Sequence, residues 1–131
     1  MIVVDASVLS VALGDDGSDG AASRAALSGE NLVAPELIDL EVLSVLRRQV
    51  KAGHMGAARA ELALTDLAEL PMRRASHRPL LQRAWELRQT VTAYDAAYIA
   101  LAEALGVALV TADVRLSRAP GARCHIDVVG R

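Results

Sequence analysis

The sequence predicts an α/β domain in which a central, mostly parallel sheet of four to five strands carries helices on both faces. Short apolar stretches rich in β-branched residues alternate with longer helical stretches along the chain. Such alternation is typical of crossover connections between parallel strands. The chain of 131 residues is long enough to bury a core, and we assign residues 1–131 to one domain.

The first half of the chain is expected to contain two strands and four helices. Gly29 and Gly53 follow helical stretches and are typical helix stops, and Pro35 fits the first position of a helix, where its missing N–H costs nothing. In chain order we expect a strand at 2–4, helices at 6–13 and 19–28, a strand at 31–34, and helices at 35–51 and 55–70.

The second half repeats the alternation. Thr92 followed three residues later by Asp95 has the pattern of a capping box, and Gly106 stands where the resulting helix should end in a left-handed residue. The other expected elements are a strand at 72–75, a helix at 79–91, a strand at 107–111, a short turn or helix at 114–119 and a last strand at 126–129. The amphipathic pattern of 79–91 places one set of side chains inward, Leu80, Leu81, Ala84, Trp85 and Leu87, and turns Arg83 and Arg88 outward.

Composition narrows the class of protein. Hydrophobic residues make up 53% of the chain and aromatic residues only 2%, which leaves no row of rings for stacking on bases. The single cysteine, Cys124, excludes an internal disulfide and fits a reducing compartment. We see neither a signal peptide nor an apolar run of membrane-spanning length, so we expect a cytoplasmic protein without membrane contact.

The charge is distributed unevenly along the chain. The net charge is −2, but residues 1–46 carry −7 and residues 47–88 carry +5. The basic middle segment could follow a phosphate backbone, or it could consist of solvated helix faces, and the sequence leaves both readings open.

Four acidic side chains are expected to meet at one edge of the sheet. Asp5 and Asp113 each follow a predicted strand, and Asp95 opens the helix that leads into the strand before Asp113. Strand C-termini and helix N-termini share one edge of a parallel α/β sheet, and ligands bind there. Glu41, six residues into the helix predicted from Pro35, is within side-chain reach of the same edge.

Each acid also has a purely structural explanation. Asp5, Asp95 and Asp113 could simply cap or complement helix N-termini. Glu41 sits on a largely apolar helix face, where the ordinary structural partner would be Arg48.

If the four acids gather, their mutual repulsion calls for a cation. An all-oxygen set of carboxylates suits Mg²⁺ or Mn²⁺, which can support phosphodiester hydrolysis. Ser7 and Thr111 lie beside Asp5 and Asp113 and could support the carboxylates or bond to local backbone. The three histidines, His54, His77 and His125, are scattered without ligand spacing.

Four segments, MIVVDASVL, ELIDLEVLSVLRR, TAYDAAYIALAEALG and LVTADVRL, resemble the successive motifs of the PIN-domain ribonucleases, in particular the VapC-type toxins of bacterial type II toxin–antitoxin pairs. The resemblance implies a single PIN-like domain with metal-binding and catalytic acids at Asp5, Glu41, Asp95 and Asp113, and supporting hydroxyls at Ser7 and Thr111. It also implies Mg²⁺- or Mn²⁺-dependent endonucleolytic cleavage of structured RNA, a homodimer, and inhibition by a cognate VapB-like antitoxin. Some relatives carry another acid just after the last Asp, where this chain has Val114, Arg115 and Leu116.

Two other functions are compatible with parts of the pattern. Phosphoryl transfer to an Asp would need a second Asp where Ser7 stands, as in dehalogenase-like phosphatases, or a lysine after the last strand, as in receiver domains, whereas the only lysine is Lys51. A catalytically inactive RNA- or protein-binding module of the same fold is the other alternative, and the presence of all four acids argues against it.

Overall fold

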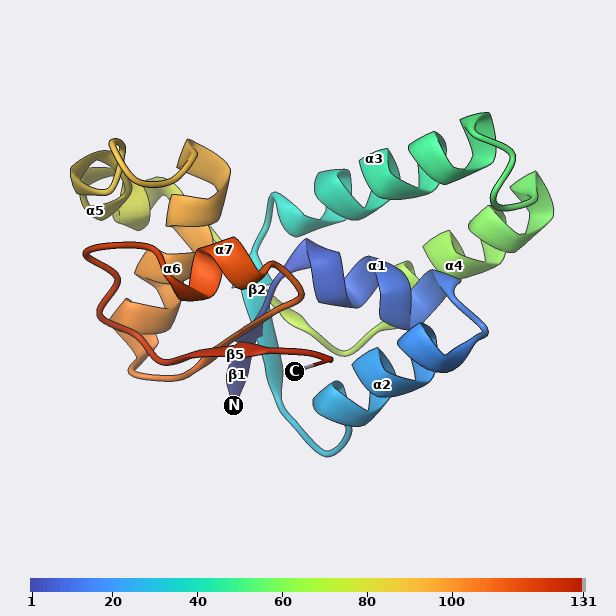
Figure 1. The fold of residues 1–131 in the computed structure, drawn as a ribbon, viewed down its shortest axis with the longest axis horizontal. Coiled ribbons are helices and arrows are strands. Elements are labelled where there is room, and N and C mark those ends of the chain that lie inside the picture. Colours follow the sequence, from blue (N-terminus) through green and yellow to red (C-terminus); the bar gives the residue numbers. More distant parts are fainter. Residues whose placement is uncertain (131) are drawn as a thin grey trace.

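The centre of the molecule is a sheet of five parallel strands in the order β3-β2-β1-β4-β5, seen in a computed structural model that describes residues 1–130 (Figure 1). The strand β1 lies in the middle and pairs with β2 on one side and β4 on the other. The strands are β1 (Ile2–Val4), β2 (Leu32–Pro35), β3 (Arg73–Ala75), β4 (Leu109–Thr111) and β5 (Ile126–Val128). This confirms the predicted parallel sheet, including the strand expected at 72–75, which forms β3. The end of the predicted domain, Arg131, lies outside the described residues.

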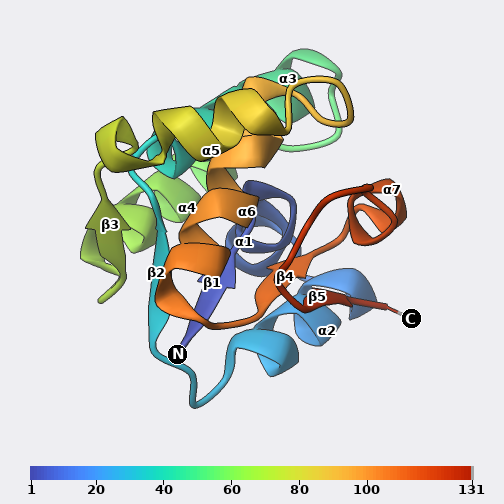
Figure 2. The ribbon, with the colours of Figure 1, turned by 90° about the vertical axis from the view of Figure 1, so that its left-hand side faces the viewer.

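Helices cover both faces of the sheet. The long helix α6 (Ala93–Leu105) packs across β1, β2 and β4 on one face, whereas α1 (Ala6–Gly14) lies on the other, where α2, α3 and α4 surround it (Figures 1 and 2). The remaining helices are α2 (Ser18–Leu27), α3 (Ile38–Lys51), α4 (Ala57–Glu69), the single 3-10 turn η1 (Arg78–Leu80), α5 (Leu81–Glu86) and α7 (Val114–Ser117). Among residues 1–130 none of these helices has the length and apolarity to cross a membrane.

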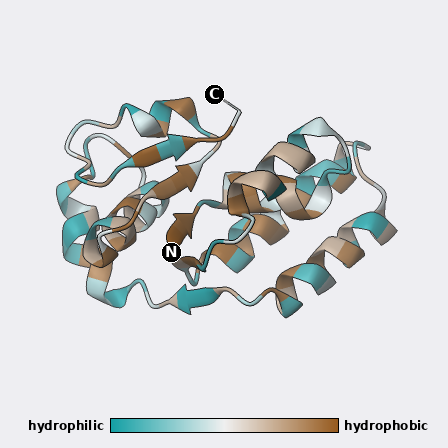
Figure 3. Cartoon of the chain, turned by 90° about the horizontal axis from the view of Figure 1, so that it is seen from below, coloured by the Kyte–Doolittle hydropathy of each residue, from teal (hydrophilic) through white to brown (hydrophobic). Residues whose placement is uncertain are grey.

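The core is formed by the central strands and the two helices that cover them. Val3, Val4, Val33 and Leu109 are fully buried, and α6 is buried along seven consecutive residues, Ala96 to Ala102. Figure 3 shows the central strands as hydrophobic, an edge strand as hydrophilic, and many outer helix turns as hydrophilic. A β-rich centre buried on both faces explains why these strands are continuously apolar and do not alternate with polar residues.

The predicted capping of α6 is confirmed. The Thr92 hydroxyl accepts a hydrogen bond from the Asp95 backbone N–H at 3.1 Å. At the other end Gly106 adopts a left-handed conformation with φ of 66°, which a glycine adopts without a Cβ clash. These two residues fix where α6 begins and therefore where Asp95 stands relative to the sheet.

The predicted position of Pro35 is wrong. Pro35 is the last residue of β2, in register with Ala75 of β3, and α3 begins only at Ile38. A proline at the end of a strand supplies the extended φ and gives up only one ladder donor. Residues 36 and 37 therefore form a turn between strand and helix, and the ladder continues through the Glu36 N–H, which donates to the Ala75 carbonyl at 2.9 Å.

The predicted helix at 79–91 is shorter, and its orientation is partly wrong. The α-helical part ends at Glu86, and the buried stripe is the single row Leu80, Ala84 and Leu87. Leu81 and Trp85 are instead 59% and 66% exposed. Arg83 turns inward to Glu103 of α6, with Nε 2.7 Å from Oε1. A single i, i+4, i+7 row is all that so short a helix can bury.

Candidate active site

The carboxyl edge of the sheet positions the four predicted acids. Asp5 follows β1 and is 7% exposed, and Asp113 follows β4. Asp95 stands in the first turn of α6, and Glu41 in the first turn of α3. The topology therefore brings to one edge acids that are separated by up to 108 residues in the sequence.

Asp5 is held by two hydroxyl groups. Ser7 Oγ donates to Asp5 Oδ2 at 2.8 Å, and Thr111 Oγ1 donates to the same oxygen at 2.7 Å. The backbone N–H groups of Ala112 and Asp113 donate in turn to the Ser7 and Thr111 hydroxyls, at 3.0 and 3.1 Å. Asp5 does not cap α1 with its side chain, so the simple capping explanation is wrong for this residue. The hydroxyl pair fixes the rotamer of the carboxylate and connects the ends of β1 and β4.

Glu41 is bound to a tyrosine that sequence reasoning missed. The hydroxyl of Tyr98, a fully buried residue of α6, donates to Glu41 Oε1 at 2.7 Å. Arg48, the partner expected for Glu41, instead donates to Ser44 at 3.4 Å, so that explanation is wrong. Burial together with the neighbouring glutamate raises the pKa of Tyr98 above its usual value, which keeps the phenol protonated as a donor. Asp95 and Tyr98 are three residues apart and therefore lie on one face of α6. This spacing is the sequence signal that could have indicated Tyr98 as a residue of the site.

The acids influence one another electrostatically. Burial raises the pKa of Glu41 above its ordinary value, the Tyr98 hydrogen bond partly offsets this, and the charges of Asp5 and Asp95 raise it further. Burial likewise raises the pKa of Asp95, with Asp5 and Asp113 adding to the effect and Thr92 and Arg115 opposing it. The charge of Asp5 thus acts on both Glu41 and Asp95, and Asp113 acts on Asp95, which connects the four acids into one electrostatic group.

Asp113 is paired with an arginine from the next turn. Arg115 Nε and Nη2 approach the Asp113 carboxylate at 3.3 Å each, and the Arg115 N–H donates to Asp113 Oδ1 at 2.9 Å. The Arg115 hydrogen bonds hold the pKa of Asp113 below its usual range. Asp113 therefore does cap α7, as one of the structural explanations predicted. Arg115 is the second site residue that sequence reasoning had not assigned.

The donor set of this edge is made of oxygen atoms. Within residues 1–130 no three His, Cys, Asp or Glu side chains are gathered closely enough to hold a metal ion. Hydroxyl groups bind Asp5 and Glu41, and a guanidinium binds Asp113. A half-buried cluster of carboxylates that raise one another's pKa values fits a hard divalent cation such as Mg²⁺ or Mn²⁺.

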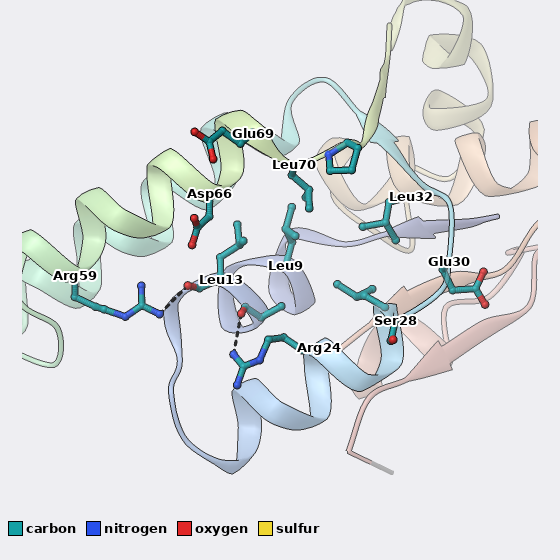
Figure 4. A pocket seen from close by; sticks show the side chains of 13 residues that line it. Leu9, Leu13, Arg24, Ser28, Glu30, Leu32, Arg59, Asp66, Glu69 and Leu70 are labelled. Carbon is teal, nitrogen blue, oxygen red and sulfur yellow. Dashed lines mark hydrogen bonds between the residues drawn. The ribbon is translucent and has the colours of Figure 1, made fainter.

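A hollow of about 530 Å³ adjoins the acids. Asp95 and Asp113 form part of its wall, and the remaining lining comes from the loop before α6 and from α7. A different hollow of about 670 Å³ lies between α1, α2 and α4, away from the acids, and Figure 4 shows its leucine-lined interior. The arginines of that second hollow, Arg24 and Arg59, donate to carbonyl groups near the end of α1 and so serve the fold.

The basic middle segment is partly structural. Arg59 pairs with Asp16, Arg74 with Asp39 and Arg83 with Glu103, at N–O distances of 3.0, 2.9 and 2.7 Å. Arg88 lies over the ring of Trp85, with its guanidinium carbon 4.3 Å from the ring centroid. Three of the basic side chains of residues 47–88 are therefore committed to internal ion pairs.

Comparison with known proteins finds a matching family model and similar sequences. The model of the PIN domain family matches residues 2–122. Ribonuclease VapC9 of Mycobacterium tuberculosis is 46% identical over 131 residues, with both chains covered completely, and ribonuclease VapC1 of the same organism is 42% identical over 97% of this chain and 96% of its own.

Solved structures share the fold. The crystal structure of PAE2754 from Pyrobaculum aerophilum superposes with a TM-score of 0.71 at 25% identity, covering 97% of this chain and 90% of that one. The structure of M. tuberculosis VapC20, described as a toxin that cleaves the sarcin–ricin loop, superposes with a TM-score of 0.69 at 17% identity, covering 90% of this chain and 94% of that one.

Proposed function

Because the chain belongs to the PIN-domain family, as a VapC ribonuclease, we propose that residues 1–131 form one PIN domain that cleaves structured RNA at the carboxylate cluster with the help of bound Mg²⁺ or Mn²⁺. The observation that carries the proposal is the convergence of Asp5, Glu41, Asp95 and Asp113 at the carboxyl edge of the sheet, where burial and mutual repulsion raise the pKa values of Glu41 and Asp95. The family model and the VapC relatives support the same reaction class.

The divalent ion would be held by Asp5, Asp95, Asp113 and Glu41, and when bound it supplies an activated water and charge screening at the phosphate. The chain's own side chains prepare the site. Ser7 and Thr111 fix Asp5 through its Oδ2 atom, and Tyr98 fixes Glu41 through Oε1. Such supporting hydrogen bonds set the direction of the ligand oxygens and limit their movement. The reaction needs no covalent nucleophile from the protein.

The reaction is tested by cleavage of a labelled structured RNA with the purified full chain. Mg²⁺ or Mn²⁺ should support cleavage, and EDTA should abolish it. Asp5→Asn and Asp95→Asn should each lower the rate at least ~100-fold, the scale on which electrostatic site groups act. Glu61→Gln, which changes an exposed acid of α4, is the matched control and should keep the rate. Equal activity in EDTA, or in the two Asp variants, would refute the proposal.

The alternative of an inactive binding module makes a different prediction. Calorimetric titration of the metal-free protein with Mn²⁺ should give heat that disappears in Glu41→Gln. An inactive module would instead show neither this heat nor cleavage, while still retaining RNA.

We propose a VapB-like antitoxin as the protein partner of this site. The support is the relationship to VapC ribonucleases and the excess of carboxylates over cations at the edge, which favours a segment bearing an arginine. The cognate antitoxin should suppress RNA cleavage when it is added to the active protein. Suppression should be lost when basic residues of its C-terminal segment are replaced. A cytoplasmic location follows from the same proposal, because the RNA targets of such a pair are there.

We further propose that the protein is a homodimer. Large apolar side chains of α3, α5 and α6 remain exposed, namely Leu40 at 71%, Leu43 at 44%, Leu81 at 59%, Trp85 at 66% and Tyr94 at 64%. The helices α3 and α5 and the beginning of α6 lie at the top of the molecule in both Figure 1 and Figure 2. A second copy would bury this surface. Leu40→Glu should give a monomer in sedimentation velocity, while the control Leu62→Glu, which changes an equally exposed leucine of α4, should leave the dimer intact.

A further inference from the structure

The hollow beside the acids contains two arginines that the proposed reaction does not use. Its lining includes Arg115 from α7 and Arg88 from the loop that precedes α6, together with Asp95 and Asp113. Hydroxyl and amide groups complete the wall, contributed by Gln89, Thr90 and Thr92. The hollow therefore brings positive charge and hydrogen-bond donors next to the cluster of carboxylates.

We propose that Arg115 and Arg88 form a phosphate-binding subsite for the RNA backbone, in which Arg115 exchanges the Asp113 carboxylate for a phosphate oxygen when RNA binds. The proposal rests on the RNA-cleaving function proposed above and adds where the substrate is held. It assigns to these residues the positioning of the phosphate that flanks the cleaved bond.

The Arg115 ion pair is suited to exchange. Its two side-chain contacts with Asp113 are long, at 3.3 Å each, and the Arg115 side chain is 92% exposed. Exposed ion pairs of this kind stabilise the folded state very little. A guanidinium can form the same two parallel hydrogen bonds with a phosphate as with a carboxylate. Arg115 can therefore leave Asp113 without loss of the fold.

Arg88 is held in place before substrate arrives. Its guanidinium stacks on the Trp85 ring at 4.3 Å, and its Nη1 donates to the Trp85 carbonyl at 3.0 Å. Among residues 1–130 the Trp85 carbonyl is the only hydrogen-bond acceptor recorded for Arg88, so other N–H groups of the fork can face the hollow. A stacked arginine loses less conformational freedom on binding phosphate than a mobile one.

Electrostatics explain why such a subsite is needed. The four carboxylates repel the RNA backbone, which carries one negative charge for each phosphate. Arg88 and Arg115 are the cationic residues among those lining the hollow. The other arginines of residues 47–88 are in part committed to internal ion pairs. Positive charge at this position offsets the repulsion where the RNA must approach most closely.

The experiment measures RNA binding separately from cleavage. The full chain is titrated onto a fluorescently labelled RNA hairpin in EDTA, which stops the proposed reaction, at several salt concentrations. Arg115→Ala and Arg88→Ala should each weaken binding about fivefold to tenfold and reduce the slope of log K against log salt by about one. Arg115→Lys should recover part of the affinity, because it retains the charge and lacks the fork.

Matched controls remove the same charge outside the hollow. Arg118→Ala changes an exposed arginine at the end of the same short helix α7, and Arg78→Ala changes an exposed arginine of η1. Both should keep affinity within about twofold, because neither side chain lines the hollow and an exposed charge that makes no direct phosphate contact is screened by salt. Equal losses in all four alanine variants would overturn the subsite in favour of a diffuse electrostatic attraction.

A second readout separates substrate binding from a structural role. Removal of the Arg115 charge should increase the affinity of the RNA-free protein for Mn²⁺ about twofold to fivefold, because the guanidinium no longer competes for Asp113, while the melting temperature stays unchanged. A fall in melting temperature with unchanged RNA affinity would overturn the proposal, because the Arg115–Asp113 ion pair would then serve to stabilise α7. If wild-type protein cleaves RNA in neither Mg²⁺ nor Mn²⁺, the proposed function itself fails. If it cleaves and Arg115→Ala behaves like Arg118→Ala, only the subsite fails.

Discussion

Replacement of Glu41 by glutamine should stabilise the metal-free protein at neutral pH while it abolishes cleavage. The native environment disfavours the ionised form of Glu41, first through burial and then through the charges of Asp5 and Asp95, and only the Tyr98 hydroxyl favours it. Glutamine keeps an oxygen that can accept the Tyr98 hydrogen bond and removes the charge. The change in stability therefore measures the cost of the ionised Glu41 carboxylate in the folded protein.

The magnitude follows from opposing terms. Burial of the ionised Glu41 carboxylate opposes folding most, and repulsion from Asp5 and Asp95 adds to it, so that together they oppose folding by about 2 to 4 kcal/mol. The hydrogen bond from Tyr98 to a charged acceptor, at about 1.5 to 3 kcal/mol, offsets much of this cost. We expect a net gain of about 1 kcal/mol for Glu41→Gln, which corresponds to about 4 °C in melting temperature for a domain of this size.

The gain should depend on pH in a defined direction. A carboxyl group whose pKa is raised in the folded state stabilises the fold below its unfolded pKa, and this contribution is lost as pH rises through the folded pKa. The advantage of Glu41→Gln should therefore be smallest at about pH 4, below the ordinary glutamate pKa, and should grow as the pH rises toward about 7.

The assay is urea unfolding in EDTA at the two pH values, with Glu61→Gln on the exposed surface of α4 as the control. A loss of stability at neutral pH, or an equal gain at both pH values, would refute the reasoning. Saturating Mn²⁺ should reverse the order, because wild type gains binding free energy that the variant lacks.

Further variants test the supports of the site and of the fold. Tyr98→Phe keeps the ring but removes the donor to Glu41. It should slow cleavage about tenfold and lower the free energy of unfolding by about 1 kcal/mol. Unchanged values would show that the hydrogen bond contributes to neither activity nor stability. Arg83→Ala should lower the free energy of unfolding by about 2 kcal/mol, measured in urea, because the guanidinium joins α5 to an acid of α6 and to a loop carbonyl; Arg78→Ala should have almost no effect. Gly20→Ala should destabilise by about 2 kcal/mol or more, since its Cβ would stand 1.8 Å from a backbone carbonyl oxygen, and a melting temperature equal to that of wild type would contradict this.

The parts of the fold that could be predicted depend on local chemistry. Thr92 and Gly106 define α6 through a cap and a left-handed residue, and both signals operate within a few residues of the chain. The apolar strands are recognisable because they are buried on both faces. From these elements the rule for parallel sheets places Asp5 and Asp113 at a common edge without any knowledge of packing.

The parts that could not be predicted depend on partners distant in sequence. Tyr98 lies 57 residues from Glu41, and nothing in the segment around Glu41 indicates a phenol in place of Arg48, two helical turns away. The helical pattern places Arg83 on the solvent face, and only the position of Glu103 on α6 turns it inward. Pro35 satisfies the rule for a helix start, yet pairing with β3 keeps it in the strand.

The contacts of the four acids explain why metal and RNA should assist each other at this site. Among residues 1–130 the side-chain donors to Asp5 and Glu41 are uncharged, the hydroxyls of Ser7, Thr111 and Tyr98, whereas Asp113 pairs with the charged Arg115. Asp113 cannot offer both carboxylate oxygens to a cation while they accept hydrogen bonds from the Arg115 guanidinium. Arg115 likewise cannot form both hydrogen bonds with a phosphate while it is paired with Asp113. Each ligand therefore breaks the same ion pair, and whichever binds first removes that cost for the other. Linkage makes the effect reciprocal, and its size is limited by the weakness of an exposed ion pair to about fivefold.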